Sequence, residues 1–203
     1  MNIFDVLLFK FAWLIKEFFY NFDLDVLYFI NHTLSNGFFD IVLPLLRNKF
    51  IWIPLYVFVV FVFIKKYRQK SLVLIGLTLL LLILSDQISS SLIKPYFHRL
   101  RPCNNPELSA WLQLPIGKGS GWSFVSSHAT NHFALAYFFS FFIFRANKKL
   151  YVPVLFYIWA GLIAFSQVYV GFHYPSDVFT GAVLGTAIAY FISKICCKYL
   201  KLN

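Results

Sequence analysis

The chain has 203 residues, of which 60% are hydrophobic and only 13% are charged. A soluble domain of this length usually carries about 25% charged residues, so the composition excludes an ordinary soluble protein. The net charge of +10 raises the question of a nucleic-acid partner. The basic residues, however, lie in short clusters beside apolar runs, a pattern typical of membrane topology and of contacts with anionic lipid. We therefore expect a membrane protein with no nucleic-acid partner.

The N-terminal segment, residues 1–48, is expected to form interfacial or partly spanning helices. Ile3–Tyr20 is apolar, and its charges fall on one broad helical face, which favours a helix lying in the membrane interface. The alternative is that it forms a sixth span. An Asn-Gly pair and Pro44 interrupt Asn21–Asn48, so that stretch is expected to be re-entrant or interfacial.

Five apolar runs approach the length of a bilayer crossing. Their hydrophobicity is continuous and not alternating, which indicates helices. The runs are Phe50–Ile64, Ser71–Ile93, Ser127–Phe144, Leu150–Val170 and Val178–Ile195. Gly181 and Gly185 in the last run form a pair of small residues that allows close helix packing. The expected fold is an all-α, polytopic membrane bundle of five or six transmembrane helices, with residues 1–203 forming a single domain.

Orientation follows from the basic clusters, which lie at alternate ends of successive spans. The clusters are Lys65–Lys70, Arg145–Lys149 and Lys194–Lys201. All three therefore fall on one side, which the positive-inside rule makes cytoplasmic. The polar stretch Pro95–Val125 is expected to be a surface loop on the opposite, extracytoplasmic side.

Three stretches bring polar side chains to that outer end. Lys94 and Arg101 are two permanent cations seven residues apart. Ser126 and His128 stand at the start of a helix, whose free N–H groups favour an anion. A third stretch places His173 four residues before a carboxylate that can orient its ring.

Together these groups predict a phosphate site with side chains for attack and for protonation of a leaving group. Each pattern also has an ordinary explanation. The cations can extend to the membrane interface, and Ser126 can cap its helix. His128 and His132 can form a polar stripe inside the bundle, and His173 can belong to a simple interhelical turn. Asp86, within the second run, is expected to form a structural hydrogen bond to a neighbouring helix.

The three stretches resemble the signature motifs of the type 2 phosphatidic acid phosphatase (PAP2) family. The resemblance rests on K-x6-R-P at Lys94–Pro102, S-x-H at Ser126–His128 and S-x6-H-x3-D at Ser166–Asp177. It covers roughly residues 94–185, close to half the chain. The superfamily also includes bacterial acid phosphatases and vanadium haloperoxidases.

The resemblance implies a role for each matching residue. His173 would be the nucleophile that forms a phosphohistidine, Asp177 would orient it, and His128 would be the general acid. The positions that would hold the phosphoryl oxygens are Lys94, Arg101, Ser126, Ser127 and Gln167. Two of these depart from the family pattern: Ser127 replaces a glycine, and Gln167 replaces an arginine, which removes a cation. No metal or other cofactor is implied.

The implied activity is metal-independent hydrolysis of a phosphomonoester or diphosphate of a membrane lipid. The enzyme would lie in the inner membrane with its active site on the periplasmic side. Phosphatidic acid, phosphatidylglycerol phosphate, undecaprenyl pyrophosphate and a lipid A phosphate are all candidate substrates. A catalytically weak or inactive relative, acting as a scaffold or transporter, is one alternative. A metal-dependent membrane hydrolase, with His128, His132, His173 and Asp177 as candidate ligands, is the other.

Overall fold

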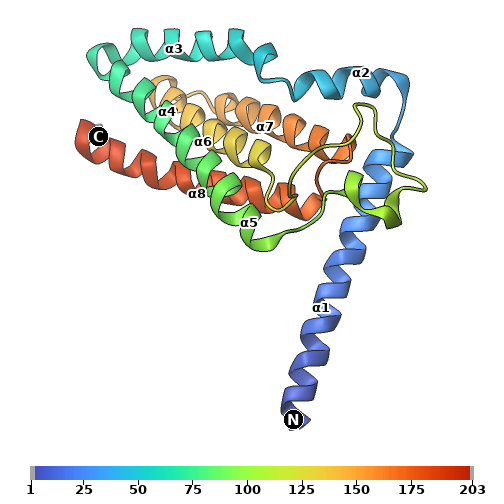
Figure 1. The fold of residues 1–203 in the computed structure, drawn as a ribbon. Helices are drawn as coiled ribbons and strands as arrows, with labels where there is room; N and C mark the ends of the chain where they lie inside the picture. The colour runs from blue at the N-terminus through green and yellow to red at the C-terminus, as the bar shows by residue number, and fades with distance from the viewer. Residues whose placement is uncertain (1–2, 202–203) are drawn as a thin grey trace.

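The computed structural model describes residues 3–201, with side chains described at residue 5 and from residue 17 onward. Every regular element in this range is helical. The helices are α1 (Ile3–Tyr28), α2 (Gly37–Leu46), α3 (Ile53–Tyr67), α4 (Ser71–Gln87), α5 (Lys94–Phe97), α6 (Ser127–Asn147), α7 (Tyr151–Tyr169) and α8 (Pro175–Leu200). Figure 1 shows α3, α4, α6, α7 and α8 gathered in a bundle, from which α1 extends away.

The five predicted spans are confirmed as helices, and the all-α membrane bundle is the observed fold. By length and composition, three helical stretches of the described chain qualify as membrane spans. They are Lys49–Leu108, which contains both α3 and α4, Tyr151–Tyr169 and Pro175–Leu200. The helix α6 does not qualify, because its first turns carry serine, histidine and asparagine. It is the most enclosed helix, so protein and not lipid surrounds these polar groups.

The predicted boundary at Asn21 is wrong. The first helix continues to Tyr28 and passes into a π-helical turn, Phe29–Thr33. No helix ends at Asn21, and Asp23, two residues farther on, is buried against the bundle. Asn36 does mark a boundary, since its side chain accepts a 3.0 Å hydrogen bond from the Phe39 N–H and caps α2. Whether α1 crosses the bilayer stays a prediction.

The bundle is built around α6, which packs most extensively against α8 and then against α7. The two predicted glycines lie on the α8 face of this contact. A Cβ atom at Gly181 would stand 2.7 Å from the Ser126 carbonyl oxygen, and one at Gly185 would stand 2.0 Å from the Thr130 carbonyl oxygen. The close packing expected of this pair is confirmed.

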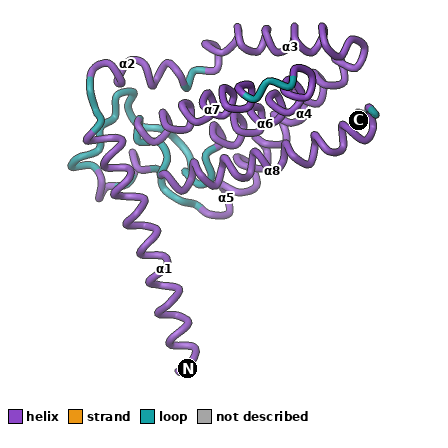
Figure 2. Tube along the Cα trace, turned by 180° about the vertical axis from the view of Figure 1, so that it is seen from behind, coloured by secondary structure: helices purple, strands orange, loops and turns teal. Residues whose placement is uncertain are grey.

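The α3–α4 turn and the C-terminus, which carry two of the three basic clusters, lie at one end of the bundle in Figure 2, and the third cluster lies between α6 and α7. Lys70 donates a 2.8 Å hydrogen bond to the Leu200 carbonyl, and Tyr67 donates a 2.7 Å bond to the Phe142 carbonyl. These contacts join the α3–α4 turn to the ends of α6 and α8. The N-termini of α6 and α8 therefore lie together at the opposite end, where the polar motifs are.

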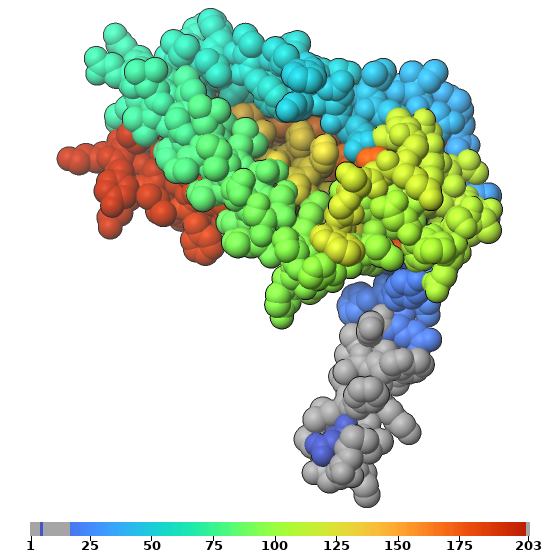
Figure 3. Space-filling view, in the orientation of Figure 1, coloured from blue at the N-terminus to red at the C-terminus, as the bar shows by residue number. Residues whose placement is uncertain are grey.

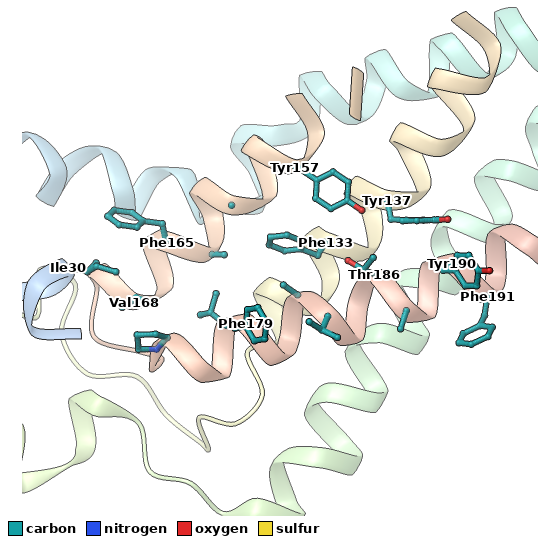
Figure 4. Close-up of a pocket in the computed structure, with 17 residues that line it drawn as sticks. Ile30, Phe133, Tyr137, Tyr157, Phe165, Val168, Phe179, Thr186, Tyr190 and Phe191 are labelled. Carbon is teal, nitrogen blue, oxygen red and sulfur yellow. The ribbon is translucent and has the colours of Figure 1, made fainter. Parts of the chain in front are cut away.

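An apolar groove of about 880 Å³ runs between α6, α7 and α8. Phe133, Tyr157, Phe179 and Tyr190 project into it in Figure 4. No charged residue is among the residues that line it. The groove resembles a surface in contact with lipid chains, and no histidine or charged side chain that could act in catalysis lines it.

The α6–α8 contact should make Gly185→Ala destabilising, because the added methyl group would overlap the Thr130 backbone. We expect a loss of about 1–3 kcal/mol in the free energy of unfolding, measured as a lower melting temperature in detergent. Gly161→Ala in α7 is the matched control, since a Cβ atom there meets nothing within 4 Å. Equal melting temperatures for the two variants would contradict the close contact.

Candidate active site

The loop that carries His173 is fixed by its backbone. The Gln167 carbonyl accepts hydrogen bonds from the N–H groups of Phe172 (3.1 Å) and His173 (3.2 Å). Gly171 has a φ of +72°, which favours glycine. Its carbonyl accepts a 2.9 Å bond from the Cys103 N–H, which ties this loop to the long loop after α5. His173 is consequently held at the base of the site with only 1% of its surface exposed.

Asp177 lies in the first turn of α8 and is fully buried. Its Oδ2 atom is 3.5 Å from Nδ1 of His173, at the outer limit of a hydrogen bond, and Nδ1 has no other partner. The same oxygen accepts bonds from the Tyr174 N–H (2.9 Å) and from the Ser123 hydroxyl. The predicted His–Asp pair is therefore formed, with the carboxylate held in place by other groups.

Arg99 is the main partner of this carboxylate, and the sequence reasoning missed it. Its Nη1 atom lies 2.6 Å from Oδ1 of Asp177, and its Nη2 atom lies 2.7 Å from Oδ2 of Asp23 in α1. The guanidinium also stacks on the Tyr174 ring, 3.9 Å from its centroid. Two features of the sequence could have pointed to this network. Arg99 is a third cation inside the first motif, between Lys94 and Arg101, and Asp23 is an acidic residue in an apolar helix.

Arg101 contacts the other ring nitrogen of His173. Its Nη1 atom is 3.2 Å from Nε2 of His173 and 3.2 Å from the Phe172 carbonyl, while its Nε donates to the Ser120 carbonyl at 2.8 Å. None of these partners is acidic. The cation thus lies beside Nε2, and it makes this side of the ring favourable for an anion.

His173 is held in its neutral form. Burial lowers its pKa from 6.5 to about 4, and the positive charges of Arg101 and Lys94 act in the same direction, against Asp177. The ring takes up a proton only as the pH falls through about 4. At neutral pH it keeps the free lone pair that a nucleophile needs.

The second motif lies against the third. The Ser126 N–H donates a 3.1 Å bond to the Asp177 carbonyl, and its hydroxyl accepts a 3.4 Å bond from the Ala129 N–H. Ser126 therefore acts as the cap of α6, and its expected contact with phosphate stays a prediction. The neighbouring Ser127 hydroxyl is 2.9 Å from that of Ser90 in the π-helical turn before Lys94.

His128 opens onto a polar cavity of about 570 Å³. In Figure 3 this region is the hollow between α3, α4 and the long loop, with α6 visible at its base. The lining residues that can form hydrogen bonds are Arg47, Asn48, Lys49, Tyr56, Asp86, Ser127, His128, Asn131 and His132. His173 and Lys94 are not among the residues that line this cavity, and Arg47 and Lys94 are cations whose charges act on the His128 ring.

Gln167 is fully buried, and neither its Oε1 nor its Nε2 has a hydrogen-bond partner. The position at which the family pattern has a cation thus holds a neutral side chain with unused capacity. Arg47, at the end of α2, lines the cavity beside His128 and was not predicted from the sequence. No motif contains it.

The expected structural role of Asp86 is confirmed, since its Oδ1 accepts a 3.2 Å bond from Asn131 of α6. His132 is also engaged in packing: its Nδ1 lies 2.8 Å from the His128 carbonyl oxygen, and its ring meets the edge of Trp159. Within the described part of the chain, no three His, Cys, Asp or Glu side chains are grouped as metal ligands would be. The four side chains that the metal-dependent alternative would use as ligands are therefore not grouped around one metal position.

Comparison with known proteins identifies the family. A family model described as the PAP2 superfamily matches residues 75–198. The chain belongs to the PAP2 superfamily. It is 34% identical over 173 residues to a protein of Porphyromonas gingivalis named lipid A 4'-phosphatase, covering 82% of this chain and 68% of the relative. A protein of the same name from Bacteroides thetaiotaomicron is 31% identical, with 83% of this chain and 74% of the relative covered.

Two solved structures share the PAP2 fold. LpxE of Aquifex aeolicus aligns with a TM-score of 0.64 at 22% identity, covering 84% of this chain and 94% of that one. The transmembrane PAP2-type phosphatidylglycerolphosphate phosphatase of Bacillus subtilis aligns with a TM-score of 0.69 at 19% identity, covering 90% and 87%. This chain is accordingly a PAP2-type membrane lipid phosphatase.

The Arg99 network should be required for the stability of this PAP2 fold. Arg99→Met would leave the buried Asp177 without its cation, and we expect a loss of about 3 kcal/mol in the free energy of unfolding. Asp23→Asn is the comparison variant, because it preserves the Arg99–Asp177 pair and should lose less. Melting temperatures in detergent measure both. A melting temperature for Arg99→Met at or above that of Asp23→Asn would argue against this ranking.

Proposed function

We propose that this protein is a metal-independent phosphatase that hydrolyses a phosphomonoester of a lipid A-type saccharolipid. The reaction would pass through a phosphohistidine on His173. The observation that carries the proposal is the environment of this one ring. Its Nδ1 faces a buried carboxylate, its Nε2 faces Arg101, and its pKa of about 4 keeps it neutral. This arrangement suits a nucleophile directed at a bound phosphate.

In the proposed first step, Nε2 of His173 attacks phosphorus in line, and the bond from phosphorus to the lipid oxygen breaks. Lys94, Arg101 and the amides at the start of α6, near Ser127, hold the non-bridging oxygens. His128 donates a proton to the departing oxygen. The dianionic phosphate favours the protonated form of His128 before this step.

In the second step, neutral His128 takes a proton from water, and the resulting hydroxide attacks the phosphohistidine. The bond from phosphorus to Nε2 breaks, inorganic phosphate leaves, and His173 regains its lone pair. Asp177 stabilises the positive ring during both steps by facing Nδ1. His128 thus acts first as acid and then as base.

Two observations support a sugar-linked phosphate as substrate. Two relatives, 34% and 31% identical to this chain, are named lipid A 4'-phosphatases. The cavity beside His128 is also lined by amide, carboxylate and hydroxyl groups, which are the partners that sugar hydroxyls require. Phosphate release from purified protein should therefore be faster with lipid A than with phosphatidic acid, phosphatidylglycerol phosphate or undecaprenyl pyrophosphate.

The decisive experiment traps the intermediate. Protein quenched during turnover of a phosphate-labelled lipid A should carry an acid-labile, base-stable label, and His173→Ala should carry none and release no phosphate. Activity should persist in EDTA, because cationic side chains supply the positive charge. Normal turnover by His173→Ala would sink the mechanism. Loss of activity in EDTA with recovery on adding zinc would favour the metal-dependent alternative.

We also propose that the site opens on the periplasmic side of the inner membrane, since the basic clusters gather at the other end. A cysteine introduced at Lys118, in the exposed loop, should react with an impermeant reagent added to the periplasm. One introduced at Lys149, in the basic cluster between α6 and α7, should react only after permeabilisation. Both variants need a Cys197→Ser background, because Cys197 is a partly exposed thiol. Labelling of both from one side would overturn the topology.

A further inference from the structure

Arg47 brings a cation to the active site from outside the three PAP2 motifs. It is the C-cap residue of α2 and lines the polar cavity together with His128. Its guanidinium carbon lies 4.4 Å from the centroid of the Phe172 ring, and that of Arg101 lies 5.4 Å from the same centroid. Both guanidinium groups therefore lie near the ring of the residue that precedes His173, and the charge of Arg101 acts on Arg47.

The charge of Arg47 is not neutralised by the protein. Among the described residues its guanidinium forms no hydrogen bond or ion pair, and its Nε is buried without a partner. Burial and the charge of Arg101 lower its pKa to about 10, which leaves it charged at neutral pH. A partly buried cation without a counter-ion is unfavourable unless an anion binds there. Arg99, in contrast, has two carboxylate partners.

The third motif contains a neutral residue, Gln167, whose side chain is unusual in its surroundings. The amide of Gln167 is completely buried, and both of its polar atoms lack partners. It stands where the related motif carries an arginine. The chain therefore has one positive charge fewer in the third motif and one unpaired positive charge at the end of α2.

We propose that Arg47 binds the phosphate of the substrate and supplies the positive charge that Gln167 cannot. This inference rests on the proposed phosphatase activity and adds to it a contact from the N-terminal third of the chain. The phosphate would lie between Arg101 and His173 on one side and Arg47 and His128 on the other. A phosphomonoester dianion is the ligand whose charge this arrangement matches.

The test compares Arg47→Met, which preserves an apolar stem against Phe172 but removes the charge, with Arg47→Lys, which restores a charge. The probe is orthovanadate, and its inhibition constant is measured alongside kcat/KM for lipid A. In Arg47→Met the inhibition constant should rise and kcat/KM should fall, each by about 10- to 100-fold. Arg47→Lys should recover part of both. Arg68→Met, an exposed arginine at the opposite end of the bundle, is the matched control and should change neither.

A purely structural role for Arg47 would give a different result. Arg47→Met would then lower the melting temperature but leave the inhibition constant for orthovanadate unchanged, and Arg47→Lys would behave like Arg47→Met. That outcome, with His173→Ala still inactive, would overturn the role of Arg47 and leave the phosphatase mechanism standing. If His173→Ala keeps its activity, the mechanism itself fails. If Arg47→Met does not fold, the inhibition constant of Arg47→Lys decides: a raised constant supports phosphate binding, because lysine loses the two-pronged contact of arginine, and an unchanged constant contradicts it.

Discussion

The buried carboxylate of Asp177 is the constraint on which the rest of the site depends. A negative charge in a helix bundle is stable only when cations and hydrogen-bond donors surround it. Its partners come from separate parts of the chain: Arg99 and Ser123 from the long loop, and the Tyr174 N–H from the start of α8. Arg99 extends the network to Asp23 in α1. One buried charge therefore holds together the N-terminal helix, the loop and the helix that follows His173.

Membrane packing and catalysis are joined at the contact between α6 and α8. Gly181 lies against the Ser126 carbonyl, directly beside the turn that carries His128. The Ser126 N–H in turn donates to the Asp177 carbonyl. Because no side chain separates the two helices here, their N-termini meet, and the second and third motifs share one site. A larger residue at Gly181 would move His128 relative to His173, which connects the small-residue pattern to the geometry of proton transfer.

The spans and motif residues could be predicted because each has a local signal. Continuous hydrophobicity marks α3, α4, α7 and α8, and fixed spacing marks His173 and its carboxylate. Arg47, Arg99 and Ser123 could not be found in this way, because their roles depend on contacts with residues far away in the sequence. The break expected at Asn21 failed for a related reason. The first helix continues past this point, and Asp23 there forms a pair with Arg99 of the distant loop, a contact that no local pattern shows.

The partners of each arginine near the site indicate what its charge does. Arg99 is bound by two carboxylates, so its charge is used within the fold. Arg101 contacts only carbonyl oxygens and a neutral ring, and neither Arg47 nor Lys94 has an acidic partner among the described residues. Positive charge thus accumulates around a histidine that is itself uncharged. A dianionic phosphate neutralises this excess, whereas a divalent cation would be repelled by it. The surplus of unpaired cations at one end of an apolar bundle is therefore a stronger sign of the ligand than the shape of any cavity.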